Sequence, residues 1–173
     1  MTSFALPLRS APGGFFLFFF LLNCLLSVGA LSYGRQESDV LLPSGVYAII
    51  NRVLSPDDER LAITFNGEDE TVTVTAWTND TTQQWVIADY DTTTQSVSPA
   101  SNQDLQAAWG DDVVTVLSAG SYVWTIRNND TGYTIQDGGV TVFWGVAEAV
   151  DDANVTIGAG TGNDTQRWLF ESV

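Results

Sequence analysis

Carboxylates and hydroxyls are the side-chain groups with which this sequence could carry out chemistry. The 173-residue chain contains 21 acidic residues and no His, and its six basic residues are all Arg. The single Cys and the single Met lie within the first 30 residues, which we expect to be removed. The rest of the chain therefore has no histidine base, no thiolate nucleophile, no imidazole or thiolate metal site and no lysine for a Schiff base.

Acidic residues cluster at four places, which could form calcium loops or pairs of glycosidase carboxylates. The clusters are Asp57-Asp58-Glu59, Glu68-Asp69-Glu70, Asp111-Asp112 and Asp151-Asp152. None has the alternating oxygen ligands of an EF-hand loop, and each lies where the sequence predicts a turn. We therefore predict solvated surface charge, a protein without a metal or other cofactor, and no enzymatic activity.

The net charge narrows the range of partners. The formal charge of the whole chain is −15, and it becomes more negative when Arg9 is removed with the N-terminal segment. A surface this acidic repels phosphate backbones and anionic lipids, which argues against nucleic acid and membrane surfaces as partners. Neutral glycans and proteins remain as possible partners.

The first 30 residues have the organisation of a secretory signal peptide. Arg9 supplies a positive charge, an apolar run extends from Phe15 to Val28, and the small residues Gly29 and Ala30 follow. The run is shorter than the roughly 20 apolar residues that a membrane span needs, so we predict a secreted, extracellular protein without membrane insertion. Residues 31–42 should form a short exposed lead-in, and residues 43–173 the folded domain.

Four N-x-Ser/Thr sequons fit an exported chain. They begin at Asn79, Asn129, Asn154 and Asn163, and we predict these residues as glycosylation sites. Three of the four lie in stretches rich in Asp, Thr and Gly, which favour exposed loops.

Two-residue alternation of apolar residues predicts a β-hairpin at three places, each with an aromatic residue at the end of its first strand. These first strands carry Leu61-x-Ile63-x-Phe65, Leu105-x-Ala107-x-Trp109 and Val140-x-Val142-x-Trp144. A glycine follows the aromatic residue in each copy, so we align Phe65, Trp109 and Trp144 with one another.

A further strand opens each copy, and a strand containing tryptophan closes it. The opening strands carry Tyr47 with Ile49, Gln95 with Val97, and Tyr133 with Ile135, and the closing tryptophans are Trp85, Trp124 and Trp168. The copies are about 40 residues long, and three units of four strands without a helix predict an all-β fold, the β-trefoil. Six strands then close into a barrel capped by three hairpins, which leaves no exposed sheet edge.

The closing strand of the second unit differs from the other two. Gln83 stands two residues before Trp85, and the third unit has the same Gln-x-Trp pattern, whereas Tyr122 stands two residues before Trp124. We interpret the Gln-x-Trp tryptophans as core residues and the glutamine as an amide that ties neighbouring backbone. A ring in place of that amide favours a ligand contact at Tyr122.

Gly45-x-Tyr47 at the start of a unit and Gln-x-Trp at its end resemble ricin-B-like β-trefoil lectins. The runs SGVYAIINRVLSP, LAITFNG, QQWVIADYD, LQAAWG and YVWTI are similar in particular to the small mushroom lectins typified by the inky-cap lectin, and the similarity covers nearly all of residues 44–173. The resemblance implies a lectin for GlcNAc-containing, fucosylated chitobiose-type glycans of glycoproteins or glycolipids. It also implies a role in defence against nematodes or insects.

The same resemblance implies one carbohydrate-binding site, in the second unit. Carried over position by position, it assigns contacts to Trp109, Leu117, Ser121, Tyr122, Val123, Trp124 and Tyr90. Ser121 stands where the family has Asn, which changes one side-chain hydrogen bond and hence the preferred glycan. Trp124 also occupies the position of the core tryptophans, so both a core and a binding role stay open for it.

Two other functions stay open. A trefoil protease inhibitor would carry its specificity in an exposed loop, such as residues 54–60 with Arg60 or residues 147–154. A non-catalytic wall or matrix protein would have no saturable ligand.

Overall fold

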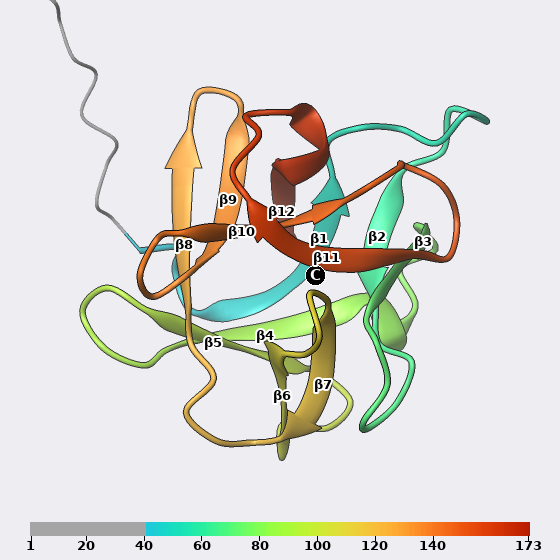
Figure 1. The fold of residues 1–173 in the computed structure, drawn as a ribbon. Helices are drawn as coiled ribbons and strands as arrows, with labels where there is room; N and C mark the ends of the chain where they lie inside the picture. The colour runs from blue at the N-terminus through green and yellow to red at the C-terminus, as the bar shows by residue number, and fades with distance from the viewer. Residues whose placement is uncertain (1–40) are drawn as a thin grey trace, which may run out of the picture. The chain divides into compact units, whose positions relative to one another are not determined.

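The computed structural model describes residues 41–173, so the predicted signal peptide and residues 31–40 lie outside the described residues. This part of the chain contains twelve strands and two short 3₁₀ turns, and none of its helical segments could cross a membrane (Figure 1). The strands are β1 (Gly45–Asn51), β2 (Leu61–Thr64), β3 (Thr73–Ala76), β4 (Gln84–Asp89), β5 (Gln95–Pro99), β6 (Leu105–Trp109), β7 (Val114–Ser118), β8 (Trp124–Asn129), β9 (Gly132–Asp137), β10 (Val142–Val146), β11 (Ala153–Ala159) and β12 (Trp168–Ser172). The turns are η1 (Thr81–Gln83) and η2 (Asp164–Gln166).

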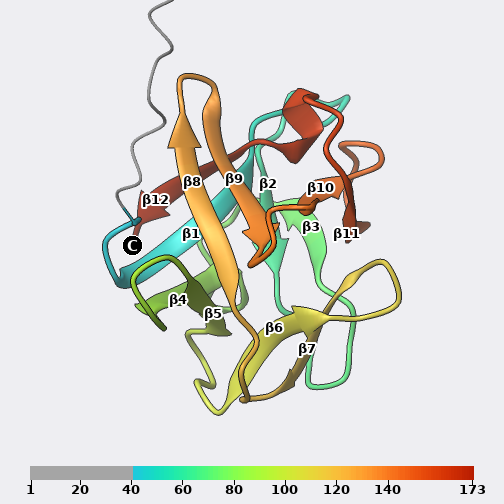
Figure 2. The ribbon, with the colours of Figure 1, turned by 60° about the vertical axis from the view of Figure 1, so that its left-hand side comes forward.

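Six of the strands form a closed antiparallel barrel. Strand β1 pairs with β4 and β12, and the ring continues through β5, β8 and β9 back to β12. In Figure 2 these strands lie to the left of the hairpins β2–β3 and β10–β11. Because the ring closes, neither edge of the barrel sheet is left unpaired.

The hairpins β2–β3, β6–β7 and β10–β11 are joined to one another through backbone hydrogen bonds. The N–H of Val72 donates to the carbonyl of Val114 (2.8 Å), and the N–H of Val155 donates to the carbonyl of Val72 (2.9 Å). All three valines are fully buried. The arrangement is the predicted β-trefoil, with units β1–β4, β5–β8 and β9–β12.

Each closing tryptophan fastens its unit's hairpin to the barrel. All three indole rings are buried, and each Nε1–H donates to a backbone carbonyl on the first strand of the hairpin. The pairs are Trp85 with Ile63 (2.9 Å), Trp124 with Ala107 (2.9 Å) and Trp168 with Trp144 (3.3 Å).

These hydrogen bonds correct the predicted alignment of the third unit. Trp144 is equivalent to Ile63 and Ala107, and not to Trp109, because strand β10 continues through Gly145 instead of ending there. The glycine is needed inside the strand, since a Cβ on it would lie 2.7 Å from Cγ of Gln166. The ring of Trp144 is buried and packs edge-on against Trp124, with ring centroids 4.8 Å apart.

The predicted lead-in is not exposed over its whole length. Leu42 is buried in the core at 5 % exposure, and its carbonyl accepts a hydrogen bond from Nε2 of Gln95 (2.6 Å). The next residue is also fixed, because the Tyr47 hydroxyl donates to the carbonyl of Pro43 (2.8 Å). Gln95 pairs with the closing tryptophan of its unit as Tyr47 and Tyr133 do in theirs. Its smaller side chain at this end of the barrel gives Leu42 room to pack.

Leu42→Ala is expected to destabilise the domain although the residue precedes the first strand. Removal of a buried leucine side chain typically costs about 2 kcal/mol or more of unfolding free energy. Leu54→Ala is the matched control, because Leu54 is 46 % exposed and its truncation should change stability by less than about 0.5 kcal/mol. Urea denaturation of the two variants measures the difference, and equal midpoints would contradict a core role for Leu42.

Candidate functional site

In units 1 and 3 the Gln-x-Trp glutamine ties the hairpin to the turn before the closing strand. Oε1 of Gln83 accepts a hydrogen bond from the N–H of Thr78 (2.9 Å), and its Nε2 donates to the carbonyl of Ala76 (2.9 Å). Gln166 makes the same pair of bonds, from the N–H of Thr161 (2.8 Å) and to the carbonyl of Ala159 (3.0 Å). The predicted structural role of the amide is thus confirmed.

Both glutamines also end a 3₁₀ turn. The N–H of Gln83 donates to the carbonyl of Asp80 (2.9 Å), and the N–H of Gln166 donates to that of Asn163 (3.0 Å). The backbone before the closing strand is therefore folded back on itself in units 1 and 3.

Unit 2 replaces this arrangement. Gly120 occupies the position of Thr78, and its N–H donates to Oε1 of Gln106 (3.0 Å), a residue of β6. The facing strand of the hairpin thus supplies the acceptor of the missing amide. The segment before β8 forms no 3₁₀ turn, and the backbone N–H and carbonyl groups of Ser121 and Tyr122 have no hydrogen-bond partner within residues 41–173.

The ring of Tyr122 lies against the backbone of Gly120. A Cβ on Gly120 would be 3.3 Å from Cε2 of Tyr122, and the tyrosine is half-buried. Leu117, also half-buried, is the cross-strand partner of Gln106. By the alternation of strand residues these two point away from the core residues Val116 and Leu105, so they belong to the outward face of the hairpin.

Tyr90 reaches the same region from the loop between β4 and β5. It is 54 % exposed, and its hydroxyl lies 3.5 Å from Oγ of the exposed Ser121. We call the group Tyr90, Gln106, Leu117, Gly120, Ser121 and Tyr122 the unit-2 cluster. Val123 follows it directly, half-buried, as the last residue before β8.

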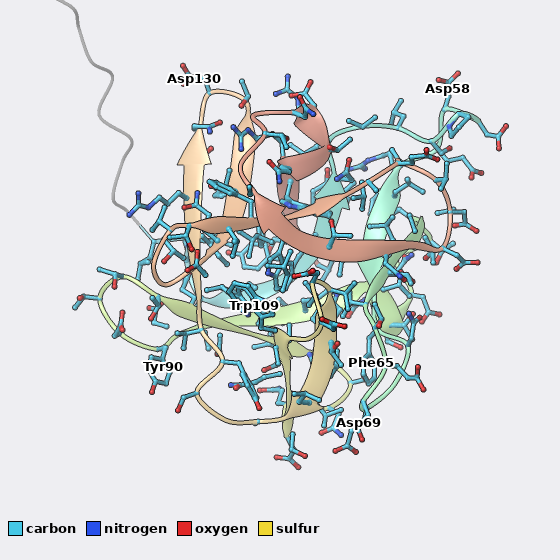
Figure 3. The ribbon with its side chains drawn as sticks, in the orientation of Figure 1. Asp58, Phe65, Asp69, Tyr90, Trp109 and Asp130 are labelled. Atoms are coloured by element: carbon cyan, nitrogen blue, oxygen red, sulfur yellow. The ribbon has the colours of Figure 1, made fainter. Side chains whose placement is uncertain are left out.

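Trp109 is exposed and lies on the same hairpin, three positions along β6 from Gln106. It pairs with Val114 at the closed end of the β6–β7 hairpin, whereas Leu117 pairs with Gln106 near the open end. Figure 3 shows Trp109 and Tyr90 at separate places on the molecule. Trp109 is 47 % exposed, and these two residues are the exposed aromatic side chains of the described part of the chain.

The equivalent residue is half-buried in unit 1 and buried in unit 3. Phe65 packs edge-on against Trp85 with ring centroids 6.5 Å apart, and Val146 is 3 % exposed. Exposure at this position is therefore particular to unit 2.

The side chain of Trp124 lies in the core, which is one of the two roles that the sequence left open for it. It is 2 % exposed, and its indole N–H is already paired with the carbonyl of Ala107. Tyr122 can replace an amide on the surface, but the tryptophan two residues later still has to fill the core.

Asp91 holds the loop that carries Tyr90. Its Oδ1 accepts hydrogen bonds from the backbone N–H groups of Thr93 (2.7 Å) and Thr94 (2.8 Å). These bonds stabilise the ionised carboxylate and lower the pKa of Asp91 from 3.8 to about 2. The hydrogen bond from the Thr93 backbone makes the largest contribution. The carboxylate is therefore ionised at any ordinary pH.

The remaining predicted features lie elsewhere on the surface. Asn79, Asn154 and Asn163 are exposed and Asn129 is half-buried, so each is reachable, and glycosylation itself stays a prediction. Within residues 41–173 no group of three or more acidic side chains is placed to hold a metal ion. Arg60 lies over the ring of Trp77, 4.3 Å from its centroid, and pairs with Glu171.

Gln106 and Gly120 are the members of the cluster that sequence reasoning missed. A signal for Gln106 exists, because the equivalent residues, Ala62 and Phe143, are apolar. The sequence pattern alone leaves the register of β6 against β7 open, and only this register shows that Gln106 lies opposite Leu117.

The chain is similar to a known protein family in sequence and to solved structures in fold. A family model described as CCL2 lectin-like matches residues 45–168. Among solved structures the chain is similar to a mosquitocidal holotoxin, with a TM-score of 0.69 and 16 % identity, over 77 % of this chain but 18 % of that one. No curated protein sequence shows significant similarity.

Two fungal proteins match over their whole length. The Rhizoctonia solani agglutinin has a TM-score of 0.62 and 14 % identity, over 78 % of this chain and 99 % of that one. The Macrolepiota procera ricin B-like lectin, solved in complex with lactose, has a TM-score of 0.61 and 14 % identity, over 78 % of this chain and 100 % of that one. At such identities these likenesses establish the fold alone.

Acidification should release the Tyr90 loop only at very low pH. Because the folded-state pKa of Asp91 is lowered, its contribution is present above the ordinary value of 3.8 and is lost as the pH falls through about 2. An NMR titration of the Asp91 carboxyl carbon should give a midpoint near that lower value.

The Asp91→Ala variant tests the same contact at neutral pH. We expect faster hydrogen exchange at the amides of Thr93 and Thr94, because both lose their acceptor. Asp111→Ala, in the exposed loop between β6 and β7, is the control and should leave both amides unchanged. Unchanged exchange in Asp91→Ala would show that another group holds the loop.

Proposed function

The chain belongs to the CCL2 lectin-like family, and from this premise we propose that it binds GlcNAc-containing glycans of the fucosylated chitobiose type without catalysing a reaction. The proposed binding surface is the unit-2 cluster, extended by the backbone of Val123. The glycans would be carried by glycoproteins or glycolipids.

The observation that carries the proposal is the open backbone before β8. Units 1 and 3 close this segment with a 3₁₀ turn and a glutamine, whereas in unit 2 the backbone N–H and carbonyl groups of Ser121 and Tyr122 are unpaired among the described residues. Unpaired donors and acceptors beside a half-buried ring are the combination that sugar recognition needs. The equivalent segments of the other units are closed by the turn and the glutamine.

The chemistry of the cluster suits a neutral, partly apolar sugar. GlcNAc and fucose each present a face of C–H groups and a methyl, which can lie on the rings of Tyr90 and Tyr122 and on Leu117. Their hydroxyls can exchange hydrogen bonds with the backbone and with the hydroxyls of Tyr90 and Ser121, which lie 3.5 Å apart. No charged group is required, in agreement with the acidic character of the chain.

Trp109 is included as a separate contact. Its exposed ring at the closed end of the hairpin could cover a further sugar residue of a longer glycan, since aromatic rings lose little conformational entropy on binding. Trp124 is left out because its side chain belongs to the core.

Export and defence remain part of the proposal. The N-terminal segment supports secretion, and the four sequons support glycosylation in the secretory pathway. A role against nematodes or insects rests on the family resemblance.

Arg60 is the candidate specificity residue of the protease-inhibitor alternative, and its side chain has other contacts. Arg60 stacks on Trp77 and is paired with Glu171, so it is not presented to a protease. Titration of trypsin-like proteases with the purified protein is expected to leave their activity unchanged.

Tyr122→Ala is expected to weaken glycan binding without unfolding the domain. Loss of a stacking ring in a binding site typically costs about 1–2 kcal/mol, which raises Kd about 5- to 30-fold. Isothermal titration calorimetry with fucosylated chitobiose measures this change, and Leu54→Ala is the control because that exposed side chain lies on the loop between β1 and β2. Binding by the wild type that is unaffected in Tyr122→Ala would remove the site from unit 2, and no binding by the wild type would end the proposal.

Expression in a eukaryotic secretory host tests the export proposal. We expect the protein in the medium with an N-terminus close to residue 31 and a mass that falls on treatment with an N-glycan-specific endoglycosidase. Replacing Asn79, Asn129, Asn154 and Asn163 by Gln one at a time should assign the glycans. Retention of residues 1–30 in the cell-associated protein would contradict secretion.

A further inference from the structure

Gln106 has an amide whose orientation is fixed by its one protein partner. The backbone N–H of Gly120 can only donate, so the group 3.0 Å from it must be the side-chain carbonyl of Gln106. The NH₂ group therefore faces the other way. It has no hydrogen-bond partner within residues 41–173, and the residue is half-buried.

The surroundings of this NH₂ group are apolar on one side. Leu117 lies directly across the strand pair from Gln106, and the ring of Tyr122 lies against the glycine to which Gln106 is bonded. A donor is thus presented at the edge of an apolar patch on the outward face of the hairpin.

The equivalent positions in the other units cannot do the same. Ala62 is fully buried and packs with Trp77. Phe143 covers its own hairpin so closely that a Cβ on Gly160 would lie 2.6 Å from its ring. A half-buried amide donor at this position is therefore a feature of unit 2 within the described residues.

We propose that Gln106 is a specificity-determining residue that donates a hydrogen bond from Nε2 to the acetamido carbonyl of a bound GlcNAc residue. This inference rests on the function proposed above and names the sugar group that the site reads. The acetamido methyl would lie on Leu117 and Tyr122, and the carbonyl oxygen would meet the amide at the edge of that patch.

The chemistry of the acetamido group matches this arrangement. It combines a methyl that prefers an apolar surface with a carbonyl that can only accept a hydrogen bond. A hexose with a hydroxyl at the same carbon lacks the methyl and does not extend as far. Such a sugar would leave the NH₂ group desolvated by its neighbours and without an acceptor, which lowers affinity.

Gln106→Glu separates the two roles of the side chain. The carboxylate can still accept the hydrogen bond from the N–H of Gly120, so the hairpin connection is retained, but it has no donor to offer. We expect binding of chitobiose to weaken about tenfold, since a donor is lost and an acceptor is set against the sugar carbonyl. The thermal unfolding temperature should be unchanged within error. A purely structural role for Gln106 would instead lower it.

Gln103→Glu is the matched control for charge. Gln103 is exposed in the loop between β5 and β6 of the same unit, so its replacement adds the same negative charge outside the cluster. This variant should bind chitobiose as the wild type does.

A ¹⁵N spectrum provides a direct readout of the amide. The side-chain NH₂ resonances of Gln106, assigned by their absence in Gln106→Glu, are expected to shift when chitobiose is added to the wild type and to shift less when cellobiose, which has no acetamido group, is added. Those of Gln103 should not move.

The outcomes distinguish this inference from the proposed function. If the wild type binds chitobiose and Tyr122→Ala does not, while Gln106→Glu binds like the wild type and the NH₂ resonances stay in place, the role of Gln106 is overturned and the lectin site stands. If the wild type binds neither chitobiose nor its fucosylated form, both are overturned.

Discussion

Each closing tryptophan carries an indole N–H into the core, and an unpaired polar group there would cost about 1–3 kcal/mol. The three units meet this constraint in the same way, by donating to a carbonyl on the first strand of the hairpin, at Ile63, Ala107 and Trp144. The bond joins barrel to cap within each unit. It also determines which hairpin residues are equivalent, and so which of them face solvent.

With that bond in place, the core tolerates unequal side chains at equivalent positions. The three carbonyl acceptors belong to an isoleucine, an alanine and a tryptophan, and the indole of Trp144 packs edge-on against Trp124 of the unit that carries the alanine. At the other end of the barrel Gln95 replaces a tyrosine, and Leu42 enters the core beside it. Volume that one unit lacks is filled by a neighbouring segment, as close packing requires.

The candidate site arises where unit 2 keeps the tryptophan bond but changes the amide. In units 1 and 3 one glutamine holds both the hairpin end and the 3₁₀ turn. In unit 2 the hairpin end is held from β6 by Gln106, so the segment before β8 no longer has to turn back to reach it. An aromatic ring and open backbone then appear at the surface while the bond from Trp124 to Ala107 is kept.

The fold of this protein and the unit that differs from the other two could be predicted from the sequence. Alternating apolar residues, three closing tryptophans and a repeat of about 40 residues predict a β-trefoil, because only closure of three such units buries the apolar face of each. The exchange of glutamine for Tyr122 likewise marks unit 2 as different. Local pattern could not decide the burial of Trp124 and Leu42, the alignment of Trp144, or the exposure of Trp109. Those depend on strand register and on which carbonyl each buried N–H reaches, and both are fixed only when strands distant in sequence pair in three dimensions.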